Sequence, residues 1–203
     1  SKTNVQVEGV DEGDIIKNDG KYIYIIKGNS VRIVEAYPAS NLKELVKFEF
    51  TTSDENFYPT DLYLDGNTLV VLGGSYVYYA YDVEPTGTTT LDAKIAPYPN
   101  NSSRVKAFVL DVTDHTKPKV VRTAEFDGYL NTSRKIDDTL YMVMNYSQYY
   151  PYPYYGIYAP QSSDFGLYVP KMKDSQVGVD EQIAPCDQIK IIPHTKNFNY
   201  LIT

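Results

Sequence analysis

One short pattern occurs three times along the chain and constrains its fold more than any other feature. In each copy an Asp-Gly-type turn leads directly into an apolar, β-rich strand, and the copies span residues 19–26, 65–72 and 137–144. Such a turn between apolar runs predicts a β-hairpin. In the third copy Asp138 replaces the glycine and the turn is one residue shorter. The chain is therefore expected to consist of repeated units that each contain a β-hairpin.

A second repeated pattern gives each unit two more strands. Residues 34–50 align without a gap on residues 110–126, and both segments run as strand, turn and strand before closing on Glu-Phe. Asp111, Asp114 and Pro118 supply turn chemistry in the second copy. Four strands per unit, repeating about every 40–50 residues, are typical of a propeller blade. The sequence thus predicts an all-β fold, a β-propeller fragment of about three four-stranded antiparallel blades.

The blade boundaries follow from the repeats, with residues 1–203 forming a single β-propeller portion. Blade 1 is expected at about 14–53, blade 2 at about 59–128 with an insertion at 84–103, and an incomplete blade 3 at about 129–203 with a Tyr/Pro-rich insertion at 146–187. No segment keeps a 3.6-residue apolar period, so little helix is expected. Three blades do not close a ring. Either a longer chain or another molecule is expected to cover the open blade edges, and self-association through those edges is one outcome.

Charge and composition exclude several classes of partner. The net charge of −7, from 19 basic and 26 acidic residues, argues against binding to nucleic acid. No apolar stretch approaches the 18 or so residues of a membrane-spanning helix. The chain has 21 tyrosines and no tryptophan. Because tyrosine suits both pleated sheets and wet interfaces, this composition favours a β protein that makes contacts outside its core.

The opening stretch, Thr3 to Gly20, resembles a family of secreted archaeal and bacterial proteins with a C-terminal β-propeller domain distantly related to WD40 repeats. The similarity continues through residues 34–38, 110–114 and 132–134 and covers most of the chain outside the two insertions. This resemblance implies an exported protein, extracellular or at the cell surface, with more blades than three. It implies no catalytic residues.

The segment from Tyr146 to Pro160 is the strongest candidate for a binding loop. Prolines stiffen it toward an extended form, and its tyrosines offer large rigid contact areas that suit a protein or a glycan at the cell surface. The alternative is a loop folded over its own propeller face with half-buried rings. The tyrosines are Tyr146, Tyr149, Tyr150, Tyr152, Tyr154, Tyr155 and Tyr158.

Four asparagines fit the glycosylation pattern N-x-Ser/Thr, and together with the resemblance to exported proteins they predict a glycosylated surface. They are Asn100, Asn101, Asn131 and Asn145.

Metal binding and catalysis have weaker support. Asp11, Glu12 and Asp14, with Glu8 before them, could offer oxygen ligands to Ca²⁺, but they lack the spacing of an EF-hand loop. The alternative is a solvated turn between an N-terminal strand and the first blade. No other cofactor is expected.

No serine or cysteine stands in a recognisable nucleophile motif, and the two histidines, His115 and His194, lie in predicted turns. We therefore expect a non-catalytic binding or scaffold module. One alternative is a secreted glycan-active enzyme with an unrecognised Asp/Glu pair. Another is a structural subunit of an extracellular assembly completed by strand exchange.

Overall fold

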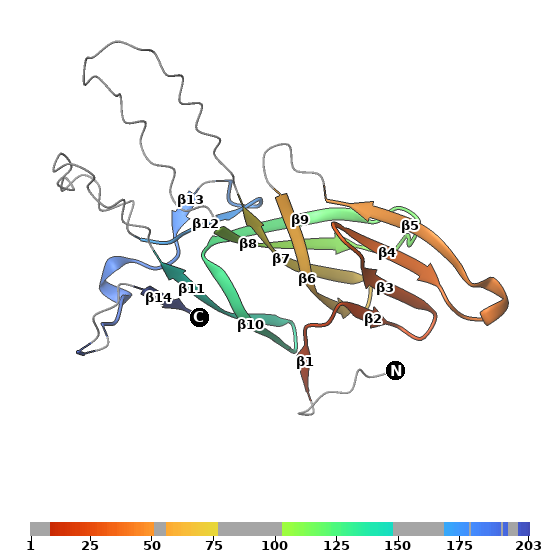
Figure 1. The fold of residues 1–203 in the computed structure, drawn as a ribbon, viewed down its shortest axis with the longest axis horizontal. Coiled ribbons are helices and arrows are strands. Elements are labelled where there is room, and N and C mark those ends of the chain that lie inside the picture. The colour runs from red at the N-terminus through yellow and green to blue at the C-terminus, as the bar shows by residue number, and fades with distance from the viewer. Residues whose placement is uncertain are drawn as a thin grey trace, which may run out of the picture.

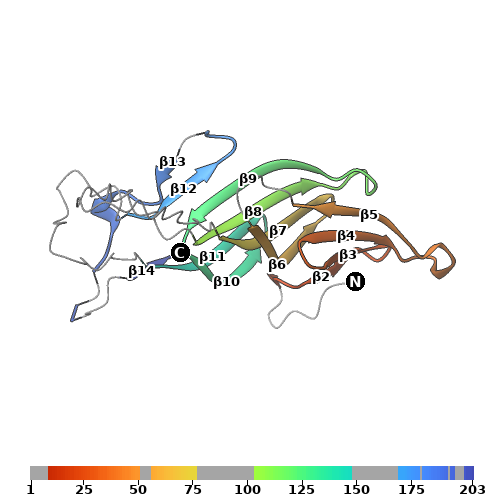
Figure 2. The same cartoon turned by 45° about the horizontal axis from the view of Figure 1, so that its top comes forward.

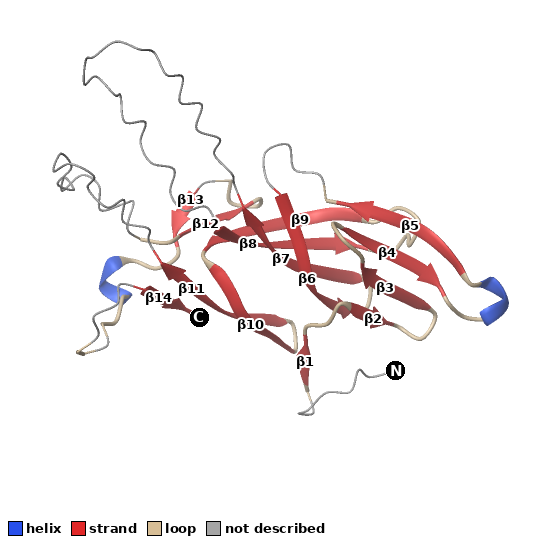
Figure 3. Cartoon of the chain, in the orientation of Figure 1, coloured by secondary structure: helices blue, strands red, loops and turns tan. Residues whose placement is uncertain are grey.

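The computed structural model describes residues 9–50, 56–76, 103–147, 169–178, 180–191, 193–194 and 199–203. These residues form three antiparallel β-sheets that lie side by side in chain order (Figures 1 and 3). The helical residues described are two short 3₁₀ turns, η1 (Ala39–Asn41) and η3 (Cys186–Gln188). The prediction of an all-β chain with little helix is confirmed. Within the described ranges no helix has the length and hydrophobicity needed to cross a membrane.

Each sheet corresponds to one blade. The sheet of blade 1 has the order β2 (Ile16–Asn18), β3 (Tyr22–Ile26), β4 (Ser30–Glu35) and β5 (Lys43–Glu49). Blade 2 begins with β6 (Asn56–Asp65), β7 (Thr68–Tyr76), β8 (Ser103–Asp111) and β9 (Lys119–Asp127). Blade 3 has the order β1 (Val10–Glu12), β10 (Tyr129–Ile136), β11 (Thr139–Ser147) and β14 (Asn199–Ile202).

Both repeated patterns appear in the structure. Each of the three predicted turns joins the first two long strands of a blade, and in blades 2 and 3 the first residue of the turn has a positive φ, +53° at Gly66 and +50° at Asp137. Aspartate tolerates this left-handed conformation better than most residues. The residue in the place of Gly66 is therefore Asp137 and not Asp138, and the turns of blades 2 and 3 both have two residues, so the predicted shortening of the third turn is wrong. The gapless match of the second pattern extends to a β-bulge, which lies between Ile33 and Val34 in one copy and between Val109 and Leu110 in the other.

Each blade has two faces, because neighbouring rungs of a ladder point to opposite sides of the sheet. We call the side toward the next blade in chain order the front face and the opposite side the back face. In blade 2 the rung formed by Tyr63 and Val70 lies on the front face, and the rung formed by Leu62 and Val71 lies on the back face.

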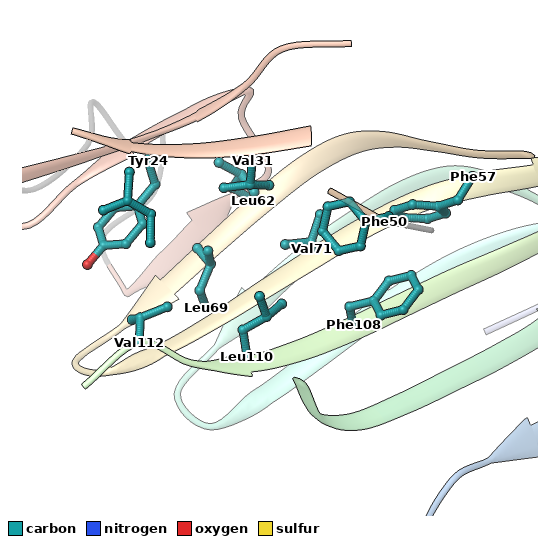
Figure 4. Close-up of a cluster of buried hydrophobic side chains, with 11 residues drawn as sticks. Tyr24, Val31, Phe50, Phe57, Leu62, Leu69, Val71, Phe108, Leu110 and Val112 are labelled. Atoms are coloured by element: carbon teal, nitrogen blue, oxygen red, sulfur yellow. The ribbon is translucent and has the colours of Figure 1, made fainter. Parts of the chain in front are cut away.

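The hydrophobic core lies between the blades. The front face of blade 1 packs on the back face of blade 2, and three rings meet there: Phe50, Phe57 and Phe108, with centroids 4.8–5.0 Å apart (Figure 4). A second set of contacts joins the front face of blade 2 to the back face of blade 3. Its buried members are Tyr63, Leu72, Val105, Ala107, Met144, Tyr146 and Ile202.

The predicted insertion at 146–187 is wrong in part. Residues 146 and 147 belong to β11, and a hairpin of β12 (Lys171–Asp174) and β13 (Asp180–Gln182) joins the outer edge of β9, so that the sheet of blade 2 has six strands rather than four (Figure 2). A charged pair fixes this hairpin, since the Arg122 guanidinium donates to both oxygens of the buried Asp174 carboxylate. The remainder of both predicted insertions lies mainly outside the described residues, although Ser103 already starts β8.

The N-terminal segment crosses all three blades. β1 pairs with β10 of blade 3, the Leu62 amide of blade 2 donates to the Asp14 carbonyl at 2.8 Å, and β2 then pairs with β3 of blade 1. Residues 10–18 therefore tie the arc of blades together through backbone hydrogen bonds.

A polar pocket between the second and third blades

Two β-bulges lie at the same place in neighbouring blades. The β6–β7 ladder shifts between Pro59 and Asp61, which leaves Thr60 as the extra residue, and the β10–β11 ladder shifts between Leu130 and Thr132, which leaves Asn131. A bulge re-aims the side chains around it and interrupts the pairing of the backbone, and bulges are frequent beside functional sites.

A pocket of about 390 Å³ opens between these two bulges. Its walls come from β6, β7 and β8 of blade 2, from the start of β10 in blade 3, and from the N-terminal segment. The lining is mostly glycines, hydroxyl groups and charged or amide side chains: Gly13, Thr60, Asp61, Gly73, Gly74, Ser75, Ser103, Arg104, Val105 and residues 128–134. A pocket of this chemistry offers many hydrogen-bonding groups and little apolar wall.

Glycines allow the close backbone approaches around the pocket. A Cβ at Gly73 would lie 2.2 Å from the carbonyl oxygen of Tyr58, and a Cβ at Gly13 would lie 2.5 Å from Oδ1 of Asp61. Neither position accepts a side chain without movement of its neighbours. The sequence therefore places glycine where the N-terminal segment and the β6 bulge come closest to other groups.

The charged groups of the lining differ in how they are held. Arg134 donates to the Thr132 hydroxyl at 3.1 Å and to the Ser133 carbonyl at 2.7 Å, and its Nη2 lies 3.3 Å from Oε1 of Glu12. Asp61 accepts a hydrogen bond of 2.8 Å from the Thr60 hydroxyl. Among the described residues its hydrogen-bond partner is thus a neutral hydroxyl rather than a cation, so the Asp61 carboxylate keeps capacity to accept further hydrogen bonds from a ligand.

A buried hydrogen bond joins blade 2 to blade 3. The Tyr63 hydroxyl of blade 2 and the Ser133 hydroxyl of blade 3 lie 2.8 Å apart, and both residues are almost fully buried. Burial raises the pKa of Tyr63, so the phenol stays neutral and able to donate. The Nζ of Lys17 lies 5.7 Å from the centre of the Tyr63 ring and adds a cation–π contact.

The acidic residues proposed as metal ligands have separate protein partners. Asp11 accepts a 2.8 Å hydrogen bond from Lys17, Glu12 pairs with Arg134, and Asp14 accepts from the amide of Ile15 at 2.7 Å. Among the residues that the structure describes, no three His, Cys, Asp or Glu side chains lie close enough to hold a metal ion. The carboxylates of Asp11 and Glu12 join β1 to Lys17 of β2 and to Arg134 of β10, whereas the Asp14 carboxylate accepts from the next amide in the chain. Glu8 lies outside the described residues.

The candidate binding loop lies outside the described residues except for its first tyrosine. Tyr146 is a strand residue of β11, 6% exposed, and its ring packs with Tyr200 and faces blade 2. Desolvation raises its pKa to about 12. Tyr146 is therefore a core residue and not part of an accessible loop, because the alternation of β11 points it inward. The tyrosines at 149, 150, 152, 154, 155 and 158 are not described.

Two of the four sequon asparagines are described, and they are neighbours. The Asn145 side-chain amide donates to Oδ1 of Asn131 at 3.3 Å, and both residues are exposed. Asn131 is also a bulge residue at the pocket rim. A glycan on one would crowd the other. Asn100 and Asn101 lie outside the described residues.

The histidines have no catalytic arrangement in the described part of the chain. His115 lies in the turn between β8 and β9 and stacks on Tyr22 with ring centroids 3.7 Å apart, so it helps to join blades 1 and 2. His194 lies in a turn with φ +64°.

Apart from Asn131, which the sequence indicates only as a glycosylation site, the pocket residues were not predicted from the sequence, although one signal for them exists. Gly73 and Gly74 interrupt an otherwise apolar strand, and glycine within a strand marks a bulge or a close backbone approach. Thr60, Asp61 and Asn131 carry no such signal because bulges depend on pairing across the sheet.

Blades of antiparallel strands with cores between them define a propeller-type protein. The whole chain, residues 1–203, matches the family described as the beta propeller domain, and the protein belongs to this family. It is also 28% identical over 144 residues to the uncharacterized protein MJ1554 of Methanocaldococcus jannaschii; the match covers 71% of this chain and 17% of that protein. No solved structure matches the chain.

Proposed function

We propose that this chain is a non-catalytic binding module of an extracellular or cell-surface protein, and that the pocket between blades 2 and 3 holds a small polyhydroxylated group such as the terminal sugar of a glycan. The observation that carries the proposal is the chemistry of the lining. Hydroxyl groups, the Asn131 amide and the Asp61 carboxylate supply both donors and acceptors. The hydroxyl groups of a sugar are donors and acceptors that match such a lining.

The arrangement of charge favours binding over hydrolysis. Glycoside hydrolysis in most families needs two carboxyl groups facing the same bond. The described lining contains one carboxylate, Asp61, and the nearby Glu12 is engaged with Arg134. The rival function, a secreted glycan-active enzyme, would need a second carboxylate from elsewhere.

The test is a glycan panel applied to the natural protein, with Asp61→Asn as the variant. The exchange removes the negative charge and keeps the shape, and we expect it to weaken binding about tenfold or more. Asp187→Asn is the matched control, because Asp187 is an exposed carboxylate in η3 outside the pocket. An affinity that is unchanged in Asp61→Asn, or a panel in which no glycan binds, would refute the role of the pocket. Release of free sugar would establish the enzyme instead.

A further inference from the structure

Three of the residues that line the pocket between blades 2 and 3 are charged, and two of them have an opposite charge beside them. The three are Asp61, Arg104 and Arg134. Arg134 Nη2 lies 3.3 Å from Oε1 of Glu12. Arg104 Nη1 lies 3.3 Å from Oε2 of Glu125, and its Nε lies 3.4 Å from Oδ1 of Asp127. Both guanidinium groups are thus balanced by carboxylates of the chain itself.

The Asp61 carboxylate is not balanced in this way. Its hydrogen-bond partner is the Thr60 hydroxyl at 2.8 Å, and no lysine, arginine or histidine in the described part of the chain forms an ion pair with it. The described lining therefore carries one net negative charge. A ligand that brings a positive group to this carboxylate would complete the balance.

Strand alternation points the Asp61 side chain toward blade 3. Tyr63, two residues further along β6, lies on the front face of blade 2 and hydrogen-bonds to Ser133 of blade 3, so Asp61 lies on that same face. The N-terminal segment covers the carboxylate from another side, since a Cβ at Gly13 would lie 2.5 Å from its Oδ1. A charge that is partly shielded from water attracts an opposite charge more strongly than a fully solvated one.

We propose that the sugar held in this pocket carries a protonated amino group, which donates to the Asp61 carboxylate while the hydroxyl groups of the sugar bond to the neutral polar lining. This inference rests on the proposed sugar-binding function and adds the class of sugar. An N-acetylated sugar offers Asp61 a neutral N–H instead, and a hydrogen bond without charge on the donor is weaker. An acidic sugar would be repelled by Asp61, and the guanidinium groups of Arg104 and Arg134 already pair with carboxylates.

Isothermal titration calorimetry of the natural protein with three matched ligands tests the inference. Each ligand is the same neutral oligosaccharide, and one position of its terminal sugar bears a hydroxyl group, an acetylated amino group or a free amino group. At about pH 6, where a free amine is protonated, the amine ligand should bind about tenfold more tightly than the other two, as expected for a charge-assisted hydrogen bond. Asp61→Asn should remove this preference. Asp187→Asn, which removes an equal charge from η3 outside the pocket, is the matched control and should retain it.

The possible results separate this inference from the function on which it rests. Equal affinity of the wild-type protein for all three ligands leaves the pocket as a sugar site but overturns the requirement for an amine. A preference for the amine that persists in Asp61→Asn also overturns it, and indicates general attraction of a cation to a chain of net charge −7. Failure of all three ligands to bind overturns both proposals. The comparison of ligands on the wild-type protein needs no variant, so it decides the matter even if a substitution disturbs the fold.

Discussion

The hydrogen bond between Tyr63 and Ser133 should be worth a measurable share of the stability that joins blades 2 and 3. Tyr63→Phe removes the phenol oxygen but keeps the ring, so the packing of the blades and the contact with Lys17 remain. The Ser133 hydroxyl, 5% exposed, then loses its partner across the interface. Leaving a buried polar group unpaired costs about 1–3 kcal/mol. Because Ser133 also lines the polar pocket, from which water can reach it, we expect about 1–2 kcal/mol, in the lower part of that range.

A double-mutant cycle measured by urea unfolding checks this value. Ser133→Ala should lower the free energy of unfolding by a similar amount, since it leaves the Tyr63 hydroxyl without its partner. The double variant should lose less than the sum of the two single variants, because it contains neither unpaired hydroxyl. We expect a coupling of about 1 kcal/mol. Tyr141→Phe, which removes an exposed hydroxyl, is the control and should change the free energy of unfolding by less than about 0.5 kcal/mol. Strictly additive costs for Tyr63 and Ser133 would show that the two hydroxyl groups do not bond in solution and would refute the reasoning.

Three further predictions concern two ion pairs and the bulge of β6. Asp11→Asn should lower the free energy of unfolding by about 1.5–3 kcal/mol, measured by urea titration, because it removes the anionic partner of the almost fully buried Lys17. The hydrogen bond from Arg122 holds the pKa of Asp174 below its usual value. The stabilisation of β12 is thus complete above about pH 4, where an unfolded carboxyl titrates, and is lost as the pH falls through the lower folded pKa. Amide hydrogen exchange of β12 should accelerate in that pH range. Arg122→Gln should remove this pH dependence. Gly73→Ala should lower the melting temperature by several degrees in differential scanning calorimetry, since its Cβ would collide with backbone, and an unchanged melting temperature would contradict the close approach at the bulge.

The local parts of the fold could be predicted from the sequence because their signals are local. The turns at residues 19–22, 66–67 and 137–138 lie between strands that are adjacent in the chain, so turn chemistry and apolar patterning identify them without knowledge of the sheet. The gapless alignment of the second pattern also matches the position of the bulge, so the two copies share even an irregularity of strand pairing.

The non-local pairings could not be predicted. The strand at Lys171–Asp174 has no β-rich alternation, and it pairs with β9, some fifty residues earlier in the chain, through backbone bonds and the Arg122–Asp174 pair. Likewise, β1 pairs with the blade farthest from it in sequence. The acidic residues of β1 read as possible calcium ligands because their partners, Lys17 and Arg134, meet them only after the blades assemble.

The candidate pocket forms only when blades 2 and 3 and the N-terminal segment pack together. This explains why it could not be predicted from the sequence and why it should be well ordered. Its two walls belong to different blades, and each wall alone is only a bulge in a strand. The N-terminal segment joins the walls, because Gly13 passes over Asp61 while the residues on either side hydrogen-bond to β10 and to β6. Blades 2 and 3 cannot separate without breaking these backbone bonds and the Tyr63–Ser133 bond. A ligand of the proposed site would therefore meet side chains that folding has already positioned, and its binding would carry only a small cost for ordering them.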